Sequence, residues 1–94
     1  MNRKVEFVPA ARADLVRLIE FIADRNPRAA ARLSTFLREH TMSLSEFSER
    51  GRPGPVEGLR ELIVRFGRSR YIIRYQVRED AVVITRIWHG RERR

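Results

Sequence analysis

The chain has 94 residues, of which 43% are hydrophobic and none is cysteine, so the sequence predicts a single domain over residues 1–94 without disulfides or thiolate metal sites. No apolar run approaches the roughly 18 residues of a membrane span and no signal peptide is evident, so we expect a cytoplasmic protein. The net charge of +8 is uneven, with +2 in residues 1–47 and +6 in residues 48–94, which favours a polyanion or an acidic protein as partner.

The first half of the sequence predicts a short strand followed by two helices. Residues 4–8 alternate as in a strand, and residues 9–25 place apolar side chains at helical spacing after a proline in the first turn. Asn26-Pro27 supplies an N-cap and a first-turn proline for a second helix that reaches about Phe47. Because almost no linker separates the helices, we expect an antiparallel hairpin, with a structural role for His40 on its apolar stripe.

The second half predicts a loop and then three strands. Residues 48–58 are rich in Gly and Pro and are expected to be a connector, since they lack the Gly-Lys-Ser/Thr ending of a phosphate-binding loop. Alternating segments at 59–66, 71–77 and 81–88 are joined by short turns, which makes them antiparallel neighbours. The predicted fold is therefore α+β, in the order β-α-α-β-β-β. A helical hairpin packs on a small, mainly antiparallel sheet whose other face is partly open and bordered by arginines.

The alternation also predicts which side chains of the last two strands share a face. On the segment 71–77, Tyr71, Ile73, Tyr75 and Val77 are expected to share one face. The aromatic residues Tyr71, Tyr75 and Trp88 are expected in the core or in a groove that a protein partner covers, and stacking on nucleic-acid bases is the alternative. On the segment 81–88, one face should carry Val82, Ile84, Arg86 and Trp88 and the other Val83, Thr85 and Ile87.

Short motifs follow one another in a characteristic order along nearly the whole chain. They are Phe7-Val8-Pro9-Ala10-Ala11, Asn26-Pro27, Gly51-Arg52-Pro53, Gly58-Leu59-Arg60-Glu61-Leu62, and the segments 70–75 and 87–92. This order and spacing resemble the RelE/ParE toxins of type II toxin–antitoxin modules. The resemblance implies a cognate antitoxin, expected to be of the ribbon-helix-helix type with a C-terminal segment that wraps the toxin in a hetero-oligomer.

The two branches of that superfamily differ in chemistry. RelE-like toxins cut mRNA in the ribosomal A site, and the resemblance gives Arg91 a role at the scissile phosphate and His89 one as acid or base. ParE-like toxins inhibit DNA gyrase and have no established nuclease site. In RelE-like nucleases a cation follows a Gly-Tyr pair on the middle strand, and here that position is Ile72. The terminal Tyr and helix expected after the basic tail, which ends at Arg94, are also missing.

We therefore predict a ParE-like gyrase inhibitor rather than an enzyme. The alternatives are a metal-independent, ribosome-dependent mRNA endoribonuclease and a non-toxic nucleic-acid-binding protein of the same fold. No carboxylate pair or ligand cluster predicts a metal or a cofactor. Arginines of the sheet are expected to bind an antitoxin or target, with a solvated face or direct RNA contact as the other possibilities, because guanidinium cannot act as a base. The predicted binding residues are Arg60, Arg65, Arg74, Arg86, Trp88 and Arg91.

Overall fold

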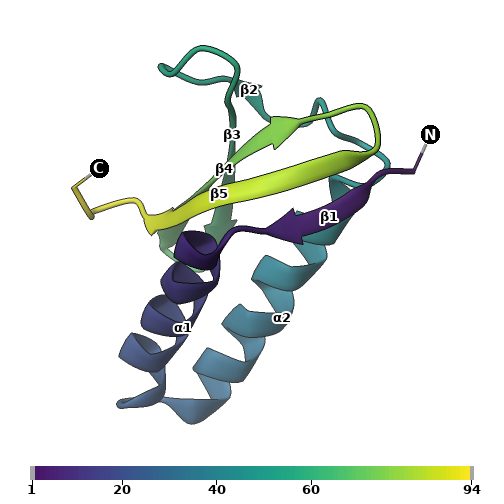
Figure 1. Cartoon of the computed structure of the whole chain (residues 1–94). Helices are drawn as coiled ribbons and strands as arrows, with labels where there is room; N and C mark the ends of the chain where they lie inside the picture. The colour runs from purple at the N-terminus through teal and green to yellow at the C-terminus, as the bar shows by residue number, and fades with distance from the viewer. Residues whose placement is uncertain (1, 94) are drawn as a thin grey trace.

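The computed structural model describes residues 2–93 as two layers, a helical hairpin and a mixed sheet (Figure 1). The hairpin covers one face of the sheet, whose strand order is β1-β5-β4-β3-β2, with β1 parallel to β5 and all other pairs antiparallel. This confirms the predicted α+β fold. The elements are β1 (Lys4–Phe7), α1 (Pro9–Ala23), α2 (Pro27–Ser43), β2 (Arg52–Pro53), β3 (Arg60–Phe66), β4 (Ser69–Val77) and β5 (Ala81–His89).

Both helices begin at the prolines that the sequence singles out. Pro9 opens α1 directly after β1, although Val8 provides no side-chain cap. Pro27 opens α2, where the side chain of Asn26 accepts a hydrogen bond from the amide of Ala29 at 3.0 Å. Between residues 2 and 93, neither helix is long and apolar enough to cross a membrane.

The second helix ends earlier than the sequence predicts, at Ser43 instead of near Phe47. The amide of Leu44 donates to the carbonyl of Thr41 at 3.1 Å, a shorter-range bond than that of an α-helix, which tightens the last turn. The hydroxyl of Ser43 donates to the carbonyl of His40 at 2.7 Å and satisfies a carbonyl that the ended helix leaves unpaired. The apolar stripe therefore continues past the helix into turns.

The segment 48–58 contains a short strand that the sequence prediction missed, because Arg52–Pro53 pair with β3 as β2. The start of this segment is fixed by Tyr75, whose buried hydroxyl accepts the amide of Gly51 and donates to the carbonyl of Ser48, each at 2.8 Å. A Cβ atom on Gly51 would lie 2.6 Å from that hydroxyl oxygen. Glycine is therefore required here for the close approach of chain and ring.

The core lies between the sheet and the hairpin, and an irregularity in β5 changes which of its side chains face this core. Tyr75 lies opposite Ile84 but Arg74 lies opposite Arg86, so Thr85 is the extra residue of a β-bulge. Its hydroxyl donates to the carbonyl of Arg74 at 3.2 Å. The prediction of one common face for Val82, Ile84, Arg86 and Trp88 is therefore wrong, because one inserted residue exchanges the two faces of a strand. The core side chains of β5 are Val82, Ile84 and Ile87.

Candidate functional site

The open face of the sheet carries paired charges on both sides of Trp88. Two nitrogens of Arg74 lie 2.8 and 3.1 Å from one carboxylate oxygen of Glu61, and the Arg74 guanidinium lies 4.8 Å from the centroid of the Trp88 ring. The Arg86 guanidinium lies 5.2 Å from the same ring, and its Nε donates to Asp14 at 2.8 Å. Both predicted cations thus meet at Trp88, but each already binds a carboxylate.

Asp14 of α1 binds the edge of β5 beyond the point where β1 ends. One of its oxygens accepts the amide of Ile87 at 2.8 Å, and the other accepts from Arg86 at 3.1 Å and Arg17 at 3.0 Å. Burial by itself raises the pKa of Asp14, but the hydrogen bonds from Arg86, Ile87 and Arg17 outweigh it, so this pKa lies below its ordinary value. The hydrogen bond to Asp14 in turn raises the pKa of Arg86. Asp14 of α1 therefore satisfies a backbone amide of β5 at the strand edge that β1 leaves unpaired.

The other predicted sheet arginines do not join this cluster. Arg60 shares the side of β3 that faces the helices, and its Nε donates to the carbonyl of Gly51 at 2.9 Å, so it holds the loop before β2. Arg65 is exposed on the open side of β3. The structure therefore brings together Arg74, Arg86 and Trp88 and separates them from Arg60.

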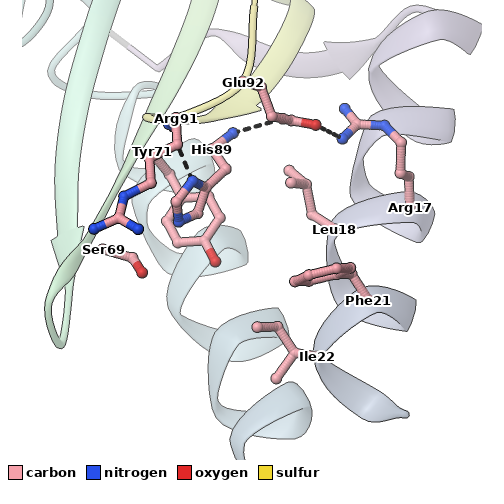
Figure 2. A pocket seen from close by; sticks show the side chains of 9 residues that line it. All are labelled: Arg17, Leu18, Phe21, Ile22, Ser69, Tyr71, His89, Arg91 and Glu92. Atoms are coloured by element: carbon pink, nitrogen blue, oxygen red, sulfur yellow. Dashed lines mark hydrogen bonds and ion pairs between the residues drawn. The ribbon is translucent and has the colours of Figure 1, made fainter. Parts of the chain in front are cut away.

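A pocket of about 580 Å³ lies where β4 begins and β5 ends, beside α1 (Figure 2). Its α1 side is apolar apart from Arg17, and its other side is formed by the two strands and the residues after β5. Figure 2 shows Arg17 and Arg91 on opposite sides of the opening. The lining residues are Arg17, Leu18, Phe21, Ile22, Ser69, Tyr71, His89, Arg91 and Glu92.

A turn after β5 closes one side of this pocket. Glu92 holds the turn, because one carboxylate oxygen accepts the amide of His89 at 2.8 Å and the other pairs with the guanidinium of Arg17 (Figure 2). The amide of Arg91 donates to Nδ1 of His89 at 3.1 Å. The predicted site residues His89 and Arg91 therefore line the same pocket. The predicted basic tail ends at Arg94, which lies outside the described residues.

Tyr71 is 2% exposed, yet its hydroxyl reaches the pocket (Figure 2). Its ring packs edge-on against that of His89, with 5.2 Å between the centroids. Burial, together with the negative charge of Glu92, raises the pKa of Tyr71 above its ordinary value. The hydroxyl makes no hydrogen bond to residues 2–93, so it remains available to a group from outside the chain.

The sequence prediction missed the contribution of α1 to both regions. Asp14 and Arg17 bind β5 and the turn after it, and Phe21 forms part of the pocket wall. A signal was present for one of them, because Asp14 lies between Ala11 and Leu18 at the spacing of buried helix positions. A carboxylate at a core position needs a hydrogen-bonding partner from another element.

Comparisons with known proteins give both branch names of one superfamily. Residues 5–94 match the family model described as the ParE toxin of the type II toxin–antitoxin system, parDE. Among curated proteins of Caulobacter vibrioides, Toxin RelE1 is 47% identical over 85 residues, covering 89% of each chain. Toxin RelE3 is 40% identical over 92 residues, covering 98% of this chain and 99% of that protein.

Two solved structures share the fold. The chromosomal ParDE toxin–antitoxin system from P. aeruginosa has a TM-score of 0.78 and 23% identity, covering 90% of this chain and 92% of that one. The toxin–antitoxin complex RelBE2 from Mycobacterium tuberculosis has a TM-score of 0.61 and 26% identity, covering 98% and 95%.

Proposed function

The chain belongs to the ParE toxin family of type II toxin–antitoxin systems, and from this premise we propose that it inhibits DNA gyrase in the cytoplasm by binding, without cleaving a bond. A cognate antitoxin, of the ribbon-helix-helix type, neutralises it in a hetero-oligomer. The RelBE2 and ParDE structures, which are toxin–antitoxin assemblies by name, support the antitoxin as partner.

One observation carries the choice of binding over cleavage: His89 and Glu92, the imidazole and the carboxylate that line the pocket, are already engaged. Nδ1 of His89 accepts the amide of Arg91, and a neutral imidazole has only one accepting nitrogen. Glu92 is held by Arg17 and by the amide of His89. Attack of an RNA 2′-hydroxyl on the adjacent phosphate needs a proton acceptor in place, as well as cations at the phosphate.

The cations of the sheet support the same choice. Arg74 and Arg86 bind Glu61 and Asp14, two carboxylates that are each only 4% exposed. A phosphate at this face would meet two guanidiniums whose charges these carboxylates already balance, which weakens its attraction to the face. The arrangement suits a rigid surface that occupies a protein target.

A supercoiling assay tests this proposal. Purified gyrase should lose supercoiling activity as the chain is added, and an equimolar amount of the cognate antitoxin should restore it. Normal supercoiling at saturating concentrations of the chain contradicts the proposal.

A ribosome-dependent mRNA endoribonuclease is the second candidate, because Tyr71, His89 and Arg91 line one pocket. Expression without the antitoxin, followed by mapping of mRNA 5′ ends, separates the two activities. We expect no cuts at A-site codons. Cuts that disappear in the His89→Ala variant would establish the nuclease instead.

A further inference from the structure

We propose that the pocket beside α1 anchors an acidic protein segment that inserts one large apolar side chain. The inference rests on the proposed function, in which the segment belongs to the antitoxin. It moves the docking site away from the basic sheet face, where the sequence alone placed it.

The first argument is the apolar wall of the pocket. Leu18, Phe21 and Ile22 of α1 form it, and Phe21 is 71% exposed (Figure 2). A large exposed ring beside a hollow of about 580 Å³ is apolar surface that a bound side chain would remove from water. Aromatic residues in such positions commonly provide much of the affinity of a protein interface.

The second argument is the Tyr71 hydroxyl. The residue is 2% exposed, and its oxygen reaches the pocket without a hydrogen bond to any residue between 2 and 93. A phenol can donate one hydrogen bond and accept another. A carbonyl or carboxylate on the inserted segment would satisfy it, and this fixes the depth to which the segment enters.

The third argument is the charge at the rim. Arg91 stands at one side of the opening, and Arg68 and Arg93 are exposed on the β3–β4 turn and the turn after β5, next in sequence to the lining residues Ser69 and Glu92. The carboxylate of Glu92, the acidic residue among those that line the pocket, forms an ion pair with Arg17. An acidic segment complements this rim, and its apolar side chain would fill the interior.

The sheet face lacks these properties. The charges of its central cations are already balanced by the buried carboxylates of Glu61 and Asp14. Arg91 at the pocket forms no ion pair within residues 2–93. The two surfaces therefore differ in how much positive charge remains for an acidic partner.

Binding of the purified cognate antitoxin to variants of the chain tests the proposal. Phe21→Ala should weaken binding roughly tenfold or more, because it removes an interface aromatic. Its matched control is Val16→Ala on the same helix, which is 55% exposed and outside the pocket lining, and should change affinity less than about twofold. Tyr71→Phe should weaken binding roughly threefold to tenfold, the loss expected for one hydrogen bond.

Equal affinities of the Phe21→Ala and Val16→Ala variants for the antitoxin would overturn the proposal. So would a loss confined to a fluorescent single-stranded oligonucleotide, since that outcome assigns the pocket to nucleic acid. Thermal unfolding of both variants checks that each is folded. If binding depends on Phe21 while gyrase supercoiling stays normal, the pocket assignment stands and only the gyrase target is wrong.

Discussion

The open face of the sheet and the pocket beside α1 both combine arginines with an aromatic ring, but they use them differently. On the face, Arg74 and Arg86 each bind a carboxylate and contact Trp88. In the pocket, Phe21 is largely exposed and the Tyr71 hydroxyl has no partner among residues 2–93. In a chain this rich in arginine, the positions of the few buried carboxylates decide which cations remain available to a partner.

The comparison predicts that changes on the face alter stability and changes in the pocket alter binding. The largest effect is expected for Trp88→Ala, which should lower the free energy of unfolding by about 3 kcal/mol, because a buried ring and its two guanidinium contacts are lost. Urea denaturation measures it. The control Arg65→Ala, on the exposed part of the same face, should change stability by less than about 0.5 kcal/mol. Similar values for both variants would break the comparison.

The next largest effect is expected for Asp14→Asn, a loss of about 2 kcal/mol. The side chain of Asn has one accepting oxygen and no charge, so it cannot accept from both the backbone N–H of Ile87 and the guanidinium of Arg86 as the carboxylate does. A buried donor is then left poorly satisfied. Denaturation at neutral pH gives the value. A variant as stable as the parent would show that the edge of β5 does not depend on α1.

The same carboxylate predicts a pH dependence. Because the pKa of Asp14 is lowered in the folded chain, its contribution is present above the unfolded-state pKa of about 3.9 and is lost as the pH falls through the folded value. The stabilities of the parent and the Asp14→Asn variant should therefore converge below about pH 4. A difference that stays constant from pH 7 to pH 3 would contradict the charged pairing.

The smallest effect on stability is expected in the pocket. Tyr71→Phe should change the free energy of unfolding by less than about 0.5 kcal/mol, because it removes no hydrogen bond within the described residues. Tyr75→Phe is the matched comparison on the same strand. It leaves Gly51 and Ser48 without their partner and should cost about 1–2 kcal/mol. Equal losses for the two tyrosines would mean that the Tyr71 hydroxyl is paired after all.

Much of the fold could be predicted because its signals are local. The helix starts at Pro9 and Asn26-Pro27 depend on neighbouring backbone groups, and the strands of the second half follow from alternation. The bulge at Thr85 could not be predicted, because it is defined by which residues of β4 lie opposite β5. The early end of α2 similarly depends on the side chains of its last turn.

The candidate site was predicted only in part, for the same reason. His89 and Arg91 were identified, and both line the pocket. Arg17 and Phe21 come from a helix some 70 positions earlier, and no local pattern links them to the end of β5. Arg86 illustrates the limit best, because the sequence shows a cation but not that Asp14 has already bound it.

The inserted residue in β5 has a consequence for how relatives are compared. If the strand paired regularly with Thr85 kept in the ladder, Trp88 would face the helices and Ile87 the open side of the sheet. Deleting Thr85 would instead remove the bulge and leave both side chains on their present faces. A relative that lacks the extra residue therefore has to be aligned with a gap at this position, because an ungapped alignment would match residues from opposite sides of the sheet.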